Sequence, residues 1–208
     1  MSFPNEAMQF YFDLRADNSR EFWAANKHRY ERHVREPLTE VMAGLAEEFG
    51  PAKIYRPYRD LRYSEDKTPY KTHQGAYVGT ALACGWYVEV NADEMSAGGG
   101  FYHADAKGLA AYRQAVDDHR RGTELQAILD RLVADGWQVV GEQLKRSPRG
   151  YPADHERVNL LRHKWLYVVH EIDPNAPSLA AVTEQVAERW RAARPLVAWA
   201  SDVLAGAH

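Results

Sequence analysis

The sequence predicts an α+β fold, in which a mostly antiparallel or mixed sheet is packed with helices in a single domain. Three observations favour this fold. Both ends of the chain carry apolar residues at helical spacing, and the middle carries short alternating segments that are typical of strands. The order of these segments lacks the regular strand–helix alternation of a doubly wound parallel sheet. The length of 208 residues suits one sizeable domain.

The first fifty residues are expected to form helices. Asn18, followed by Glu21 three positions later, predicts a capping box with Asn18 as the cap. Pro37 suits the first turn of a further helix, where its missing N–H costs nothing. That helix is expected to end at Gly50, after an apolar stripe made of Leu38, Val41, Met42, Leu45 and Phe49.

The middle of the chain has a different character. Residues 54–72 are rich in Tyr, Arg and Pro and predict an extended segment that runs into a loop. Residues 76–82, 85–90 and 95–101 are predicted to be the strands of a meander. The run Gly98-Gly99-Gly100 indicates a bulge or a close backbone approach. A phosphate-binding loop is disfavoured there, because no G-x-G-x-x-G pattern is present and no Lys-Ser/Thr pair follows.

Helices are expected again after residue 104. Asp105 is the expected cap of the first of them, and Thr123 with Gln126 predicts a second capping box. The last helix is expected to bend or restart at Pro195. Two further strands are predicted in this part of the chain, at residues 137–144 and 165–172.

The net charge of −3 conceals two basic islands. Residues 53–71 carry a local charge of +3, residues 145–164 carry +4, and the rest of the chain carries −10. Basic islands in an acidic body favour an anionic ligand. Non-specific coating of nucleic acid would favour a protein that is basic overall.

The composition also excludes several kinds of site and of targeting or membrane segment. Cys84 is the single cysteine, so an intrachain disulfide and a cysteine-based zinc site are excluded, which suits a reducing compartment. The first residues lack the basic and apolar regions of a signal peptide. Polar residues interrupt the longest apolar stretch, near Val78 to Val90, so it cannot span a bilayer. We therefore expect a soluble, cytoplasmic protein.

The run from Arg59 to His73 is the densest chemical motif of the chain. Its arginines can grip a carboxylate or phosphate with two parallel hydrogen bonds, and its lysines supply point charges. Asp60 and Asp66 can orient these cations or act as acid or base, while Tyr70 can stack on a ring or donate a hydrogen bond. An equally open interpretation is a loop fastened by structural ion pairs.

The same run, from Arg59 to Thr72, resembles the signature of a bacterial family catalogued as domain of unknown function 2461. Three further segments are similar to that family, and the resemblance extends from about residue 5 to residue 203. Tyr63 stands where the family has Phe. The resemblance implies a single-domain α/β-type protein and supplies no reaction, substrate or cofactor. The further segments are Asn18–Tyr30, Gly98–Gly100 and Lys145–Arg162.

Several specific chemistries are disfavoured. Ser64 and Lys67 have the S-x-x-K spacing of penicillin-recognising enzymes, but Pro69 opposes the helix that this motif needs, and its companion motifs are missing. The histidines match no standard metal spacing, so no metal site is predicted. No RNA-binding motif accompanies the aromatic and basic residues between Lys53 and Tyr77.

We therefore predict a pocket for an anionic small molecule, phosphorylated compounds included, in a binding module or an enzyme. The prediction depends on the two basic islands facing each other across a hollow. Alternatives are a structural or interaction protein with an internal ion-pair network and, third, a nucleic-acid-binding protein. The expected ligand-binding residues are Arg59, Arg62, Ser64, Lys67 and Lys71, with Arg146 and Arg149 closing the far side, and the expected catalytic residues are Asp60, Asp66 and Tyr70.

Overall fold

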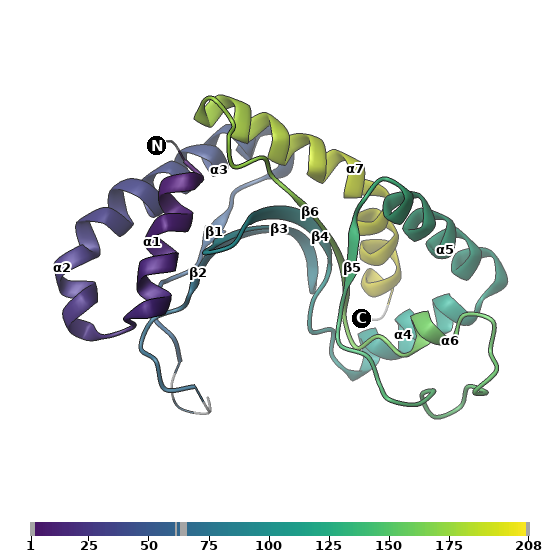
Figure 1. Cartoon of the computed structure of the whole chain (residues 1–208). Coiled ribbons are helices and arrows are strands. Elements are labelled where there is room, and N and C mark those ends of the chain that lie inside the picture. The colour runs from purple at the N-terminus through teal and green to yellow at the C-terminus, as the bar shows by residue number, and fades with distance from the viewer. Residues whose placement is uncertain (1–2, 61, 63–65, 207–208) are drawn as a thin grey trace. The chain divides into compact units, whose positions relative to one another are not determined.

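The computed structural model describes residues 3–60, 62 and 66–206 and confirms the α+β class (Figure 1). The strands form one six-stranded antiparallel sheet in the order β1-β2-β3-β4-β6-β5. The strands are β1 (Lys53–Ile54), β2 (His73–Ala81), β3 (Cys84–Asn91), β4 (Met95–Phe101), β5 (Gln138–Val140) and β6 (Leu166–Glu171). The helices are α1 (Asn5–Ala16), α2 (Arg20–Tyr30), α3 (Glu36–Phe49), α4 (Ala106–Asp117), α5 (His119–Ala134), α6 (Val158–Leu161) and α7 (Leu179–Ala205). Within the described part of the chain, no helix combines the length and the apolar character that crossing a membrane requires.

The chain divides into two compact units. Unit 1 comprises Met1–Val78, Tyr87–Ala97 and Glu171–Glu188, and unit 2 comprises Gly79–Trp86, Gly98–His170 and Arg189–His208. The expectation of a single domain stays a prediction.

In unit 1 the expected helices form, but their junctions differ from the prediction. A π-helical turn, η1 (Glu31–Arg35), joins α2 to α3 without a break. The cap of α2 is Ser19, whose hydroxyl accepts a hydrogen bond from the Phe22 amide at 3.0 Å. The prediction of Asn18 as the cap is therefore wrong, because the Asn18 side chain bonds to the backbone of Tyr70 instead.

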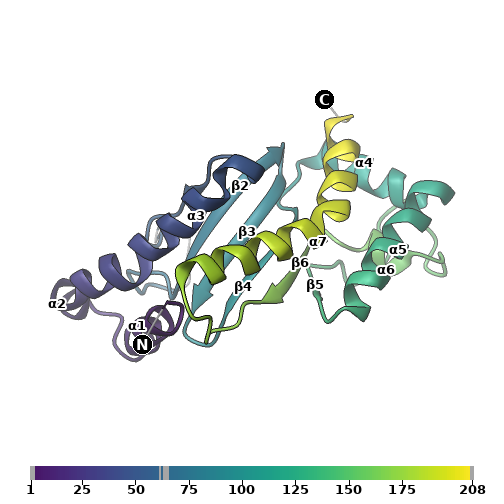
Figure 2. The ribbon, with the colours of Figure 1, turned by 90° about the horizontal axis from the view of Figure 1, so that it is seen from above.

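One face of β2 and β3 supplies part of the core of unit 1. Alternate side chains such as Ala76, Val78, Val88 and Val90 are buried there. Gly44 of α3 fits closely against Thr183 of α7, and Figure 2 shows both helices over the same face of the strands. The other face carries half-buried, mostly polar side chains, namely His73, Tyr87, Glu89 and Asn91.

In unit 2 the glycine run lies inside β4, which confirms a close backbone approach. A β-carbon on Gly98 would lie 1.7 Å from the carbonyl oxygen of Val168 in β6, so no side chain fits at that position. Gly99 likewise makes room for Trp86 and Val197. Because the run pairs within the sheet, it is not a loop that opens onto a helix.

The remaining elements of unit 2 agree with the sequence in part. Asp105 caps α4, as predicted, by accepting from the Gly108 amide at 2.8 Å. The capping box at Thr123 is wrong, because Asp118 already caps α5 and Thr123 lies inside that helix. The strand expected at 137–144 is shorter, since regular pairing stops after Val140 and returns only as one bridge. Helix α7 continues through Pro195.

Candidate functional site

The predicted motif, Arg59–His73, contributes residues to both arms of a short antiparallel hairpin in unit 1. The Arg59 amide donates to the Pro69 carbonyl at 3.0 Å, and the Lys71 amide donates to the Pro57 carbonyl at 2.8 Å. These two bonds flank the bridge between Tyr58 and Tyr70. Neighbouring residues of a strand point to opposite faces, so Arg59 and Lys71 lie on the face opposite these two tyrosines.

The tyrosine face of the hairpin is fastened to α2. The Tyr70 ring stacks on Trp23, with ring centroids 4.2 Å apart and planes inclined by 9°. The side-chain amide of Asn18 donates to the Tyr70 carbonyl at 3.0 Å, and its oxygen accepts from the Tyr70 amide at 3.1 Å. Tyr70 is 6% exposed. The structure thus places this candidate catalytic residue in a packed aromatic cluster.

Asp60 and Arg62 form a bidentate ion pair with each other in the hairpin. The Arg62 guanidinium donates to both oxygens of Asp60, from Nε at 3.0 Å and from Nη2 at 2.7 Å. Hydrogen bonds from Arg62 hold the pKa of the Asp60 carboxyl well below its usual range. The two side chains remain 46% and 77% exposed, so solvent screens the pair strongly.

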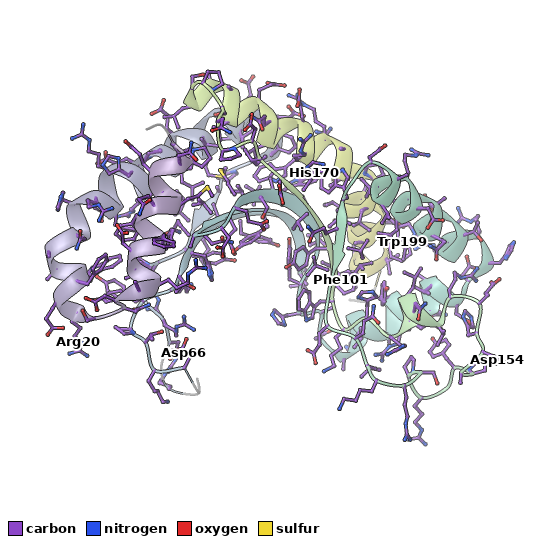
Figure 3. All side chains as sticks on the ribbon, viewed as in Figure 1. Arg20, Asp66, Phe101, Asp154, His170 and Trp199 are labelled. Carbon is purple, nitrogen blue, oxygen red and sulfur yellow. The ribbon has the colours of Figure 1, made fainter. Side chains whose placement is uncertain are left out.

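Asp66 organises the returning strand of the hairpin (Figure 3). One of its oxygens accepts from the backbone amide and the hydroxyl of Thr68, at 2.9 and 2.7 Å. The other oxygen forms an ion pair with Arg59 Nη1 at 2.9 Å. The Thr68 hydrogen bonds, followed by the charge of Arg59, lower the pKa of Asp66. Asp66 is therefore an ionised acceptor that holds the loop and orients Arg59.

The positive charges of Arg56 and Arg59 both act on Lys71, and we call Arg56, Arg59 and Lys71 the cation group. The Lys71 ammonium lies over the Tyr55 ring, 5.2 Å from its centroid. Burial lowers the pKa of Lys71, and the nearby charges of Arg56 and Arg59 lower it further. The Nε atom of Arg59 is buried and has no hydrogen-bond partner among the described residues. The group thus combines crowded positive charge with an unsatisfied donor.

A polar cavity of about 220 Å³ lies in the same unit. The Tyr87 hydroxyl donates to the Glu89 carboxylate at 2.6 Å, and His73 Nε2 lies 3.8 Å from the same oxygen. A β-carbon on Gly75 would collide with the Tyr87 hydroxyl, so this glycine lets Tyr87 lie across β2. The residues that line the cavity are Arg15, Thr72, His73, Glu89, Asn91, Ala92 and Asp93.

The sequence interpretation missed this cavity. A signal was present, because Glu89, in the strand predicted at 85–90, and Asn91, just after it, alternate with the buried Val88 and Val90. That alternation marks a polar face. It does not tell which residues of other elements line it.

The second basic island supplies mostly local contacts in unit 2. Arg157 is 8% exposed, and its Nε donates to the Val116 carbonyl at 2.7 Å, at the end of α4. Arg162 Nε donates to the Leu144 carbonyl at 2.6 Å. The predicted ligand residues Arg146 and Arg149 are exposed in the loop between β5 and α6.

Two of the predicted ligand residues remain. Lys67 is exposed in the hairpin loop, and Ser64 lies outside the described residues.

Cys84 is buried, which raises the pKa of its thiol to about 11 and keeps the sulfur protonated. Within the described ranges, no group of three or more His, Cys, Asp or Glu side chains is arranged to hold a metal ion.

Comparison with known proteins adds one finding. No curated protein and no solved structure matches the chain significantly. A family model described as "Conserved hypothetical protein (DUF2461)" matches residues 6–199, which is nearly the whole chain and includes parts of both units. The chain therefore belongs to the DUF2461 family of conserved hypothetical proteins.

Proposed function

We propose that unit 1 binds an anionic small molecule through the cation group formed by Arg56, Arg59 and Lys71. Phosphate is the favoured anionic group, because a guanidinium fork and an ammonium together match its several oxygens. The observation that carries the proposal is that Arg59 and Lys71 lie on the hairpin face opposite Tyr58 and Tyr70, with the Lys71 ammonium over the ring of Tyr55.

The geometry supports a prepared site. The ladder bonds at Pro57 and Pro69 fix the two backbones that carry Arg59 and Lys71. Asp66 holds one end of the Arg59 guanidinium and leaves the buried Nε donor without a partner among the described residues. A buried donor that lacks an acceptor is costly, so an anion that supplies one gains binding free energy.

The electrostatics support an anion as well. Arg56 and Arg59 repel the proton of Lys71, and that repulsion adds to the cost of its burial. A bound anion offsets both effects, because it brings opposite charge and hydrogen-bond acceptors to the same place. Binding should therefore raise the pKa of Lys71 toward its ordinary value.

The wider set of residues stays a prediction. Arg62, Lys67 and Ser64 are proposed to add contacts to the ligand, and Arg146 and Arg149 remain proposed ligand-binding residues. Asp60, Asp66 and Tyr70 are proposed as proton-transfer groups only if the ligand is a substrate. The contacts of Asp60, Asp66 and Tyr70 in unit 1 equally suit residues that hold the hairpin in place.

The test is calorimetric titration of the full chain with inorganic phosphate and with pyrophosphate at low ionic strength, where screening is weak. The wild type should bind both. Lys71→Gln should weaken binding at least about tenfold, which corresponds to about 1.4 kcal/mol for one lost charged contact. Lys107→Gln, which removes the same charge from an exposed position on α4, should bind like the wild type.

Two results would contradict the proposal. One is a wild type that binds neither anion, and the other is a Lys71→Gln variant that binds both as well as the wild type does. A fluorescence unfolding curve of each variant shows whether it is folded, so that loss of binding is not confused with loss of structure.

The structural alternative makes a different prediction for Arg62. An internal network requires Asp60 and Arg62 to be buried, whereas their side chains are 46% and 77% exposed. We therefore expect Arg62→Ala to leave the unfolding midpoint within experimental error of the wild type. A large fall of the midpoint would favour the structural alternative.

A further inference from the structure

The polar cavity of unit 1 suits the uncharged part of a ligand. Glu89 is 25% exposed and accepts hydrogen bonds from the Tyr87 hydroxyl at 2.6 Å and from the Asn91 side-chain amide at 3.5 Å, which leaves about two of the roughly four acceptor positions of a carboxylate. Asn91 is fixed by its side-chain oxygen, which accepts from the amides of Asp93 and Glu94 at 2.8 and 3.0 Å. Both side chains are therefore held in place with hydrogen-bonding capacity remaining.

The lining of the cavity decides what kind of group it can hold. Ala92 is the one apolar residue among the described residues that line it, and the others carry charges, an imidazole, an amide or a hydroxyl. A nucleobase or an acyl chain would find little surface to stack on. Adjacent hydroxyl groups, which both donate and accept, can pair with Glu89, Asn91 and His73. The volume of about 220 Å³ is below the range for drug-sized ligands and suits a smaller molecule.

The cavity and the cation group are linked through side chains of the same unit. Lys71 and His73 flank Thr72, which lines the cavity, and the charge of Glu89 acts on Lys71. The Tyr55 ring, below Lys71, lies 6.5 Å from the ring of Tyr87, whose hydroxyl holds Glu89. A ligand of modest length can therefore reach both places.

The charges of the cavity and of the cation group determine which end of such a ligand binds at each place. In the cavity Arg15 forms an ion pair with Asp93 at 2.7 Å, which leaves Glu89 as the carboxylate that repels a phosphate, whereas Arg56, Arg59 and Lys71 attract it. A molecule with a phosphate at one end and hydroxyl groups at the other is complementary to this arrangement.

We infer that the ligand of unit 1 is a phosphorylated sugar or polyol, whose phosphate binds the cation group while its hydroxyl groups bind Glu89, Asn91 and His73 in the polar cavity. This inference rests on the proposed anion site and names its substrate class. It assigns a specificity role to Glu89, which the motif from Arg59 to His73 does not contain.

The experiment compares the affinities of ligands that differ in their uncharged part. The wild type is titrated with inorganic phosphate, glycerol 3-phosphate, ribose 5-phosphate and glucose 6-phosphate. At least one organic phosphate should bind tenfold or more tightly than inorganic phosphate. In Glu89→Gln that ratio should fall toward one, while the affinity for inorganic phosphate stays the same or rises. Glu188→Gln, an exposed position on α7, should keep the wild-type ratio.

The outcomes separate the two proposals. If inorganic phosphate binds but none of the organic phosphates binds more tightly, the inference about the cavity is overturned and the anion site stands. A ratio that Glu89→Gln leaves unchanged also overturns it. If none of the four ligands binds, the anion site itself fails and the inference fails with it.

Discussion

The side-chain amide of Asn18 pairs with both backbone groups of Tyr70, donating to its carbonyl at 3.0 Å and accepting from its amide at 3.1 Å. The side chain thus takes the place that a neighbouring strand would occupy. Because the two residues are 52 positions apart, this pairing ties the hairpin to the start of α2.

Asn18→Ala should therefore destabilise the protein by about 1–3 kcal/mol, because it leaves two backbone groups of Tyr70 without their partner. Urea unfolding measures the loss, and hydrogen exchange should show faster exchange of the Tyr70 amide. Asn26→Ala is the matched control, since the bonds of Asn26 to described residues are with Phe22 and Arg29 of the same helix. Equal effects of the two substitutions would contradict the tying role of Asn18.

Two substitutions at Tyr70 distinguish the packing of its ring from a chemical role of its hydroxyl. Tyr70→Phe keeps the ring on Trp23, so its stability should match that of the wild type. Tyr70→Ala removes a ring that is 6% exposed and should cost roughly 3 kcal/mol. A Phe variant that folds normally but loses activity on a substrate would assign the phenol a chemical role. If both variants are equally stable, the stacking does not hold the hairpin.

The close approach at Gly98 leads to a prediction about the sheet of unit 2. A methyl group there would lie 1.7 Å from the Val168 carbonyl oxygen, so the two strands must separate to admit it. We expect Gly98→Ala to lose at least about 3 kcal/mol or to fail to fold. In Gly206→Ala the nearest atoms lie 3.8 Å away, so thermal unfolding should be close to that of the wild type. A stable Gly98→Ala protein would show that β4 and β6 are not so close.

His163 predicts a pH dependence of stability. The side chain is 4% exposed, and burial lowers the pKa of its imidazole below the ordinary value of 6.5. The unfolded chain binds the proton more readily than the folded chain. The contribution of His163 is therefore complete above pH 6.5 and is lost as the pH falls toward its folded pKa.

Urea unfolding at about pH 7.5 and about pH 5.5 measures this effect. The loss of stability on acidification should be smaller in His163→Gln than in the wild type. His119→Gln, at an exposed position at the start of α5, should keep the wild-type loss. The same loss in His163→Gln would show that other groups cause the pH dependence.

The parts of the fold that could be predicted depend on short-range patterns. The cap at Asp105 needs only residues within one turn, and the second meander strand, β3, shows buried and half-buried residues in alternation from Trp86 to Asn91. Asn18 was misassigned because its competing partner, Tyr70, is remote in sequence. A capping pattern carries no information about such a partner.

Part of the candidate site could likewise be predicted from short-range patterns, and part could not. The sequence identified Arg59 and Lys71 by the density of charge around them, and the structure places both on one face of a hairpin. The sequence alone could not identify the polar cavity, because the lining residues Arg15, His73 and Glu89 come from three separate segments of the chain. Charge density does not distinguish a ligand-binding arginine from a structural one such as Arg157 in the second island, which donates to the Val116 carbonyl at the end of α4.

The π-helical turn at Glu31–Arg35 has a consequence for how this family can vary. It occupies the middle of one uninterrupted helical stretch, with the aromatic residues Trp23 and Tyr30 before it and the stripe that ends at Phe49 after it. A π-turn holds one more residue than an α-turn over the same rotation, so deleting one residue there would give an ordinary α-helix and leave the two halves facing as before. Trp23 would keep its place against the ring of Tyr70, so relatives that shorten this turn by one residue should keep the hairpin. A one-residue deletion elsewhere in the stretch would instead rotate one half by about 100° relative to the other.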